Sequence, residues 1–492
     1  MRRLNHPFCA LLLFLSIAFG SSRAVAQICD QLPTFADGIA PTQEIHVDPA
    51  GSDVSGDGSP SAPYATIAFA AGLAVPGSAV VVHAGTYSGG FTLALQGTAL
   101  APIWIGGAPG ESRPVIDATG SSIGVRSTEP RYLVIHDLEI RHATTVGLAL
   151  DDDANYSNPL AAHHVVIRNL YIHDIGSVGN HDCLKLSGLN DFVVQGVELA
   201  SCPGQAIDMV GCHRGVIADS DVQAPFGGGI QAKGGSEDID IVRNRIAGAS
   251  DRHIGIGGTT GTTFFRPPLS TVEPNFEASR IRAMANVIID GDATVVFSGA
   301  VDSVFSNNTV IQPDVRIIRI LQETTSGGGF TFLATADGQI DNNIFHFTNA
   351  EISSQSRMIN IGAGVDAASF GFANNLWYAS DAPGSSTPSF PSPEVDGIYG
   401  VDPLLVDLTG GDYHLSMESI AIGAGLDPAR ADADFEGTCY ATPPSLGAFE
   451  GDPPAVPTLG ELPRAMLAGL LMLAVIGLLS TSSSTWPRSV KS

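Results

Sequence analysis

Charged side chains are scarce in this sequence of 492 residues. They make up 15% of it, against about 25% in ordinary globular domains. Patterns typical of long helices are also few, whereas there are 56 glycines and 31 prolines. Little charge, few helical patterns and many turn-forming residues together predict a β-rich fold with tight turns, in a chain long enough for a large or elongated core.

Positive charge is the scarcer sign, with 24 Lys and Arg against 50 Asp and Glu and a net charge of −26. No basic cluster offsets this acidic surface, so we expect no binding to nucleic acid. The same surface repels acidic polysaccharides unless a cation bridges the two.

Hydrophobic runs are short as well. Near the N-terminus, Arg2 and Arg3 precede an apolar run at 9–19, and the sequence "AVA" ending at Ala26 has the small-x-small form that a signal peptidase cuts. Residues 1–26 are therefore predicted to be a secretory signal peptide. The mature chain is expected to be secreted from the cytosol to a compartment where disulfides persist.

A second apolar run, at 465–479, is shorter than the roughly 20 residues of a membrane span. With "VPTL" at 456–459 it resembles the IPTL-type C-terminal sorting signal of Gram-negative bacteria, although Val456, Gly460 and Leu462 replace the usual Ile, Ser and Trp. This resemblance implies that a sorting protease reads the tail, that the chain meets the membrane only through it, and that the protein reaches the cell surface. The alternative is a simple hydrophobic anchor.

Five cysteines remain after signal cleavage, so at least one is unpaired. Cys29 and Cys439 flank the main body, and a disulfide between them requires the two ends to meet. Cys202 and Cys212 are close enough in sequence to close one turn, and Cys183 is the fifth. Spacing alone leaves the connectivity open.

One pattern recurs along the chain: an apolar residue, four others and a second apolar residue, often with Asn two places before the second. The pairs are Ile135/Ile140, Ile167/Ile172, Val194/Leu199, Ile217/Val222, Ile241/Ile246, Ala283/Ile288, Phe305/Val310, Ile340/Phe345 and Phe372/Trp377. Asn lies two places before the second apolar residue at Asn244, Asn286, Asn308, Asn343 and Asn375. The shortest spacing, about 22 residues, sets one coil of a repeat, and longer spacings carry loops.

Each coil also holds a second strand with two-residue alternation, as in "CLKLSG", "AIDMVG" and "GIQAKG". Short strands joined by tight turns at this spacing stack as parallel coils with Asn residues stacked in the turns. The predicted fold is all-β, a right-handed parallel β-helix. A β-sandwich would show irregular hairpins rather than one motif in register.

Both ends of the body support this fold by resemblance. The stretch 45–87 resembles the opening of secreted bacterial β-helix proteins, among them polysaccharide lyases of family nine, in which a helix, here near 64–73, caps the solenoid. The stretch 402–451 resembles their closing segment. The predicted divisions are a signal peptide, 1–26; an N-terminal cap and first coils, 27–125; central coils, 126–389; a closing segment, 390–451; and a linker with the hydrophobic sorting segment, 452–492.

Aligning the strand-ending glycines identifies which side chains face outward. One outward column reads Lys185, Asp208, Gln231 and Gly255, and the next reads Ser187, Val210, Lys233 and Gly257. The inward columns are Leu184, Ile207, Ile230 and Ile254, and Leu186, Met209, Ala232 and Ile256. Neighbouring coils lie about 4.8 Å apart, so Lys185 is predicted beside Asp208, with Lys233 diagonal to Asp208.

Two hypotheses fit this polar column. In one, Lys185 and Asp208 form a surface ion pair worth roughly 0–1 kcal/mol, in a non-catalytic glycan-binding or structural surface protein. In the other, the protein is a lyase on acidic polysaccharide, which needs a base for the C5 proton, a cation for the carboxylate and a proton donor to the leaving oxygen. A lysine of lowered pKa serves as such a base, and Asp182 with Asp208 would hold calcium.

Two local resemblances assign the catalytic roles. "HDCLKL" is similar to part of the lysine and calcium arrangement of family nine lyases, without their run of aspartates, and implies Lys185 as the base. "GIQAKGG" followed by "SDRHIGIGG" resembles the lysine-then-arginine arrangement of family six lyases, and implies Lys233 as the base with Arg252 or His253 as the acid. The acidic residues expected just before that lysine are replaced by "FGG" at 226–228.

The longest interval between repeats contains "FFRPPL" at 264–269. The two aromatic residues Phe264 and Phe265, with Arg266, are predicted to form one wall of a sugar site, and a loop packed against the solenoid by its own apolar residues is the alternative. His213 and Arg214 are expected in turns beside the lysines and complete the predicted substrate-binding set. The run "DDD" at 151–153 is either a solvated turn or a calcium site. A cleft that encloses Lys185, Asp182, Lys233 and the Arg266 loop would favour the enzyme, and a tight Lys185–Asp208 pair without a cleft would favour the alternative.

Overall fold

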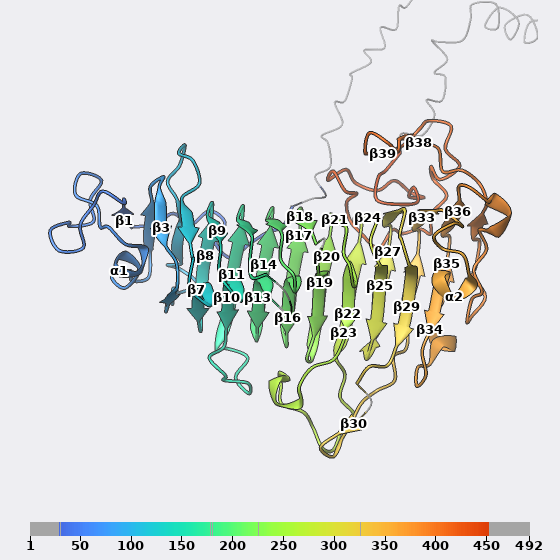
Figure 1. Cartoon of the computed structure of the whole chain (residues 1–492), viewed down its shortest axis with the longest axis horizontal. Coiled ribbons are helices and arrows are strands. Elements are labelled where there is room, and N and C mark those ends of the chain that lie inside the picture. Colours follow the sequence, from blue (N-terminus) through green and yellow to red (C-terminus); the bar gives the residue numbers. More distant parts are fainter. Residues whose placement is uncertain are drawn as a thin grey trace, which may run out of the picture.

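The computed structural model describes residues 29–451, except 30, 178, 180, 225 and 325. The predicted signal peptide and sorting segment lie outside these residues. Within them, three parallel sheets run along one elongated body, and the chain visits each in turn (Figure 1). This is the predicted right-handed parallel β-helix. No helix in the described part of the chain is long and apolar enough to cross a membrane.

The thirteen-stranded sheet begins at the N-terminal end of the body. Its strands are β1 Gln43–Val47, β2 Ser78–Val82, β5 Ile103–Gly107, β8 Arg131–His136, β11 Ala162–Arg168, β14 Leu189–Gln195, β17 His213–Ala218, β20 Ser236–Val242, β23 Ala278–Met284, β26 Ala300–Val301, β27 Val304–Ser306, β32 Gln339–Asp341 and β35 Gly371–Ala373. The first apolar residue of most repeat pairs lies on this sheet, as the pattern predicts.

The twelve-stranded sheet carries the second apolar residue of most of those pairs. Its strands are β3 Thr86–Ser88, β6 Val115–Asp117, β9 Glu139–Arg141, β12 Tyr171–His173, β15 Glu198–Ala200, β18 Asp221–Gln223, β21 Arg245–Ala247, β24 Val287–Ile289, β28 Thr309–Ile311, β33 Ile344–Phe347, β36 Leu376–Ala379 and β37 Ile398–Tyr399. It joins the thirteen-stranded sheet through very short turns.

Those turns contain the predicted asparagine ladder. The Asn244 side chain donates to Asn286 Oδ1 at 3.1 Å, and Asn286 donates in turn to Asn308 Oδ1 at 3.0 Å. At the far end of the ladder, Asn375 donates to Glu394 Oε1 at 2.7 Å. Buried amides that would otherwise lack partners are thus satisfied from coil to coil, and the ladder fixes the register of the stack.

The ten-stranded sheet carries the alternating segments. Its strands are β4 Phe91–Leu93, β7 Ile123–Thr128, β10 Val146–Asp151, β13 Asp182–Ser187, β16 Gln205–Val210, β19 Gly228–Lys233, β22 Ile254–Gly257, β25 Ala293–Ser298, β29 Arg316–Leu321 and β34 Ile359–Ile361. Both predicted inward columns are confirmed, because all eight of their side chains are fully buried in the core. Burial of such side chains is the main stabilising term of the solenoid.

The remaining elements close the ends and edges of the solenoid. They are α1 Ile67–Ala71, α2 Gln355–Met358, the 3₁₀ turns Thr262–Phe264, Ala367–Ser369 and Pro383–Ser385, and the antiparallel pairs β30 Ser326–Gly327 with β31 Phe330–Thr331 and β38 Leu405–Asp407 with β39 Asp412–Leu415. The predicted N-terminal capping helix is α1, and Thr66 caps it by accepting a hydrogen bond from the Phe69 amide.

The closing segment lies over the outer face of the twelve-stranded sheet, around β38 and β39 (Figure 1). Ala448 and Phe449 pack there against Val287, Ile289 and Ile311. A disulfide joins Cys29 to Cys439. This pairing was one of the two that the sequence left open, and it brings the two ends of the body together. The middle of the ten-stranded sheet keeps a hollowed outer face, and this is the face that bears the lysines.

Candidate functional site

The predicted column of polar side chains is confirmed on the outer face of the ten-stranded sheet. Strand pairing places Lys185 of β13 opposite Asp208 of β16, and Asp208 opposite Gln231 of β19. Lys233 pairs with Val210, one step along β19. Because the strands are parallel and in register, three consecutive coils bring these side chains together.

Asp208 is the centre of the cluster. Lys185 donates from Nζ to Asp208 Oδ2 at 2.5 Å and to Asp182 Oδ2 at 3.0 Å. Lys233 Nζ lies 3.1 Å from Asp208 Oδ1 as an ion pair and donates to Gln231 Oε1 at 3.2 Å. Asp208 Oδ1 is buried, and its contact with Lys233 is an ion pair rather than a hydrogen bond. The whole sequence has three lysines, and two of them meet here.

The protonation of the cluster follows from burial and from its neighbours. Burial alone would lower the pKa of Lys185, but the carboxylates of Asp208 and Asp182 outweigh it, so the pKa is raised. Burial would raise the pKa of Asp208, but the two lysines lower it. For Asp182 burial prevails and the pKa is raised. Lys185 is therefore held as an ammonium ion, and the expectation of a lowered lysine pKa is wrong at this position.

A groove surrounds this cluster, with a volume of about 510 Å³. Its lining residues are Ile123, Arg126, Val146, Ala149, Asp151, Ala154, Tyr156, Lys185, Ser187, Asp208, Val210, Lys233, Thr259, Thr260, Gly261, Phe264 and Arg266. Two loops, at 152–161 after β10 and at 258–277 after β22, project from the same side of the solenoid (Figure 1). We call this hollow the lysine groove. The groove encloses Lys185, Lys233 and Arg266 as expected of an enzyme, but Asp182 is not among its lining residues. The tight Lys185–Asp208 pair is present as well.

A buried ion pair joins the two loops across the end of the sheet. Arg266 donates to both carboxylate oxygens of Asp152, at 2.9 and 2.8 Å, and its guanidinium lies 4.4 Å from the centre of the Tyr156 ring. A Cβ at Gly188 would lie 2.4 Å from Asp152 Oδ2, and one at Gly211 would lie 2.6 Å from Arg266. These strand-ending glycines therefore leave space for the loops to pack onto the sheet.

This packing corrects part of the predicted sugar wall. Phe265 is buried, 2% exposed, and packs against Phe332, so the prediction that its ring contacts a sugar is wrong. The aromatic ring that lines the groove from this loop is Phe264, which is 53% exposed. Arg266 does line the groove, although Asp152 already pairs with its guanidinium.

His253 does not reach the groove. It is completely buried, and its ring nitrogens lie 3.0 Å from Ala293 O and 3.1 Å from Ile289 O. Burial lowers the pKa of the imidazole, so it packs as a structural residue at the edge of the ten-stranded sheet. The predicted role of His253 as a catalytic acid is wrong because no route leads from its nitrogens to a substrate.

Arg252 lies on the outer side of the same sheet but outside the groove lining. Its guanidinium pairs with Asp251 at 2.9 Å and with Glu323 at 3.5 Å. Burial would lower its pKa, and these two carboxylates outweigh burial and raise it. A guanidinium held in its charged form is a poor acid, so Arg252 does not fill the predicted role of proton donor beside Lys233.

His213 and Arg214 are not in turns beside the lysines. Both belong to β17 in the thirteen-stranded sheet. His213 is largely buried between Asn190 and the Gly235 carbonyl, and Arg214 pairs with Asp191 at 2.7 Å on a different face of the solenoid. Their predicted contact with a substrate in the lysine groove is therefore wrong.

A calcium ion does not fit the residues present. The carboxylates of Asp182 and Asp208 both face lysine ammonium groups, whereas calcium takes six to eight oxygen ligands, several of them charged. Among the described residues, no three Asp, Glu, His or Cys side chains are grouped so as to hold a metal ion. The "DDD" run is also engaged, since Asp151 pairs with Arg126 and Asp152 with Arg266.

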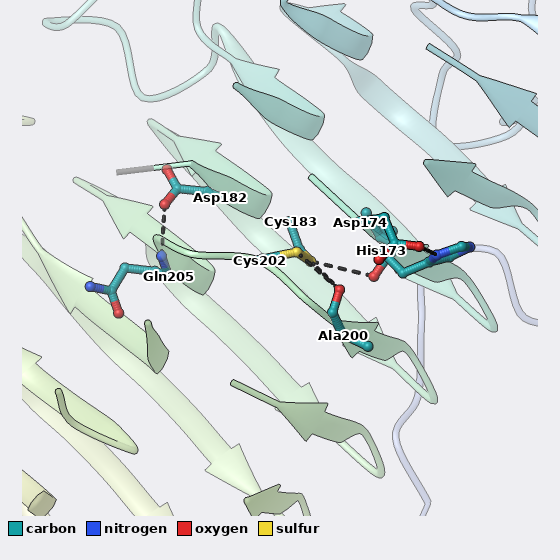
Figure 2. The surroundings of a disulfide bond; sticks show 8 residues. His173, Asp174, Asp182, Cys183, Ala200, Cys202 and Gln205 are labelled. Atoms are coloured by element: carbon teal, nitrogen blue, oxygen red, sulfur yellow. Dashed lines mark hydrogen bonds and ion pairs between the residues drawn. A yellow bond between two sulfur atoms is a disulfide. The ribbon is translucent and has the colours of Figure 1, made fainter. Parts of the chain in front are cut away.

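A disulfide fixes the base of the cluster, as Figure 2 shows. Cys183 follows Asp182 in β13 and is bonded to Cys202, so the possible pairing of Cys202 with Cys212 is wrong. Cys212 is instead a free, buried thiol. The turn that holds Cys202 leads into Gln205, whose backbone N–H donates a hydrogen bond to Asp182 Oδ1 at 2.9 Å. The disulfide thus ties together the two segments that orient the Asp182 carboxylate.

Phe264 was expected in the wall and does line the groove, whereas Arg126 and Tyr156 line it without having been found from the sequence. Arg126 shares the column of Lys185, because Ala149 pairs with both, and extending the column by two coils would have found it. Tyr156 and Phe264 lie on loops, whose course the repeat does not define. The fold and this site together define a class: a parallel β-helix with a lysine groove on the outer face of one sheet.

Comparisons with known proteins agree with this class at the level of the fold. No protein-family model matches the chain, and no curated protein matches it in sequence. A solved structure of the pectate lyase Pel9A superposes with a TM-score of 0.52 at 15% identity, covering 84% of this chain and 98% of that one. A rhamnogalacturonan lyase superposes at 0.49 with 13% identity, covering 75% and 91%. A GH136 lacto-N-biosidase from Eubacterium ramulus superposes at 0.48 with 15% identity, covering 73% and 68%.

Proposed function

We propose that the lysine groove binds an acidic polysaccharide and cleaves it by β-elimination. The observation that carries this proposal is the convergence of Lys185 and Lys233 on Asp208 inside the lysine groove. In a chain of net charge −26, two ammonium groups at one point supply the cation that an acidic sugar requires.

The environments of the two lysines separate their roles. Lys185 is held as an ammonium ion by two carboxylates, which suits neutralisation of the substrate carboxylate. Lys233 faces one carboxylate oxygen and an amide oxygen, so it is the lysine that we assign as the base. The rings of Tyr156 and Phe264 line the groove and offer apolar faces to the sugar.

In the proposed reaction, Lys233 first gives its ammonium proton to solvent and then takes the C5 proton of a uronic acid. The C–H electron pair forms the C4–C5 double bond, the C4–O bond breaks, and the leaving oxygen takes a proton from Lys185 or from water. No oxidant, reductant or metal step is required. Calcium remains a prediction from the family resemblance, and no step here depends on it.

A second function is binding without cleavage, in a structural or glycan-binding surface protein. The raised pKa of Lys185, under the influence of Asp208 and Asp182, favours it, because a cluster of paired charges also suits recognition alone. In either case we propose a secreted protein at the cell surface, with the sorting protease as a partner of the tail. The two disulfides support an oxidising compartment.

The test follows unsaturated-uronate absorbance and binding for a panel of acidic polysaccharides, with and without calcium. We expect product from the wild type and a loss of about 10²–10⁴-fold in rate for Lys233→Met. Lys185→Met should mainly weaken binding. Arg214→Met is the matched control, because it removes a cation from a different face.

The possible outcomes separate the two functions. Binding to an acidic polysaccharide without product would overturn the lyase and leave the binding protein. Product formation that survives Lys233→Met would remove Lys233 as the base. A wild-type protein that binds none of the acidic polysaccharides would refute both proposals.

A further inference from the structure

A second cationic group lies on the outer side of the same sheet, beyond the lysine groove. It consists of Arg252, which precedes β22, and of Arg316 and Arg319 in β29. We call these three residues the arginine patch. In a strongly acidic chain, three arginines gathered at one place are unexpected, because most other arginines of the body pair singly with a carboxylate, as Arg214 does with Asp191 and Arg282 with Asp240.

The register of the strands puts this patch in line with the lysine groove. The outward column that begins at Lys185 and Asp208 continues through Gln231, Gly255 and Val296 to Arg319. Figure 1 shows β13, β16, β19, β22, β25 and β29 side by side in that order. Five steps of about 4.8 Å separate Lys185 from Arg319, or about 24 Å along the solenoid.

Arg316 and Arg319 repeat the spacing of Asp182 and Lys185, but with two like charges. Arg316 makes no ion pair or side-chain hydrogen bond with any described residue, and Arg319 donates only to Asn360 Oδ1, at 3.3 Å. Burial, Arg316 and Arg252 all lower the pKa of Arg319. Glu323 and Asp251 act on that pKa in the opposite direction, but neither forms an ion pair with Arg316 or Arg319.

Arg252 lies over the sheet between the two regions. A Cβ at Gly255 would lie 3.0 Å from Arg252 Cδ, so the glycine leaves space for this side chain. Its guanidinium pairs with Asp251 and Glu323, yet the buried Nη1 atom has no hydrogen-bond partner. Among the described residues, the carboxylates that pair with an arginine of the patch are Asp251 and Glu323, and both pair with Arg252.

We propose that the arginine patch is a second anion-binding subsite, which holds a carboxylate of the same polysaccharide strand about 24 Å from Lys185. The proposal rests on the proposed function and adds to it the direction in which the substrate lies, along the axis of the solenoid. An oligomer too short to span this distance occupies one region only, whereas a longer oligomer occupies both and gains affinity by the linkage.

The test measures binding of galacturonate and alginate oligomers of increasing length to the wild type, to Arg316→Gln with Arg319→Gln, and to Arg282→Gln with Arg214→Gln as the matched control. For oligomers that span the distance, we expect the patch variant to bind at least about tenfold more weakly. For short oligomers its affinity should equal that of the wild type. The control variant should match the wild type at every length.

A second measurement excludes a merely structural role. Because Arg316 repels its neighbours in the free protein, the Tm of the ligand-free Arg316→Gln variant should equal or exceed that of the wild type, while its affinity for long oligomers falls. Three results would overturn the subsite: a lowered Tm of the variant, an equal loss of affinity for short and long oligomers, or no loss of affinity for oligomers of any length. If the wild type binds no oligomer, the proposed function fails and the subsite fails with it. This result differs from the three above, in which the wild type binds and only the subsite is refuted.

Discussion

At the scale of single residues, Asp208 is the carboxylate that pairs with both lysines of the groove. It is 1% exposed and compensates two ammonium groups, so its removal leaves Lys185 with Asp182 alone and Lys233 with an amide oxygen. A buried charge that loses its partner is costly, at about 3–5 kcal/mol. The cluster is therefore a point where stability and function depend on the same carboxylate.

We expect Asp208→Asn to lower the free energy of unfolding by about 3 kcal/mol at neutral pH. The lysines lower the pKa of Asp208, so its contribution is complete above its ordinary pKa of about 3.9 and is lost as the pH falls through the lower folded value. The difference from the wild type should therefore close in acid. Denaturant unfolding from pH 7 down to pH 2 measures it.

Asp191→Asn is the matched control for this experiment. Asp191 pairs with the half-exposed Arg214, so its loss should cost about 0–1 kcal/mol. Equal effects of the two substitutions would show that the Asp208 cluster is no more than a surface ladder.

At the scale of elements, the Cys183–Cys202 disulfide both stabilises the fold and positions a side chain beside the groove. It ties the start of β13 to the turn before β16, where the Gln205 amide holds Asp182 (Figure 2). Asp182 in turn holds Lys185 at 3.0 Å. The orientation of the lysine thus depends on two strands staying together at their N-terminal ends.

Replacing both of these cysteines by alanine should lower the free energy of unfolding by about 3 kcal/mol, as for a disulfide that closes a short loop. It should also weaken polyuronate binding, because Asp182 loses its fixed position. Denaturant unfolding and calorimetric binding measure the two effects. The control is the Cys29→Ala, Cys439→Ala variant, whose disulfide lies at the closing segment and should affect stability alone. Unaltered binding in the first variant would limit Cys183–Cys202 to a structural role.

At the scale of the whole molecule, a net charge of −26 surrounds a groove whose own charges are compensated. A polyanion approaching from a distance meets repulsion, and only within the groove does it meet Lys185, Lys233 and Arg126. Salt screens the distant charges, since the Debye length falls from about 30 Å at 0.01 M to about 10 Å at 0.1 M.

The association rate constant for a polyuronate should therefore rise severalfold between about 0.01 M and 0.1 M salt, opposite to the behaviour of a basic binding protein. Stopped-flow or surface-based kinetics measures it. A rate that falls with salt would show that the local cations, and not the net charge, control the encounter.

The sequence by itself determined the solenoid and the centre of the site. In a parallel β-helix each coil adds one strand in register, so spacing along the chain fixes which side chains become neighbours across strands. For this reason the contacts of Lys185 and Lys233 with Asp208, the inward columns and the asparagine ladder were all predicted correctly.

Only the tertiary structure decided what lies off the repeat. The Asp152–Arg266 pair joins residues that are 114 positions apart in the sequence. The disulfide partner of Cys202 is Cys183, not Cys212. His253 is buried, with its ring against the Ala293 carbonyl. Loops and corners follow no two-residue period, and their course is set by packing against distant coils. The protonation of Lys185 was likewise beyond the sequence, because it depends on the balance between burial and two carboxylates, one in its own strand β13 and one in the neighbouring strand β16.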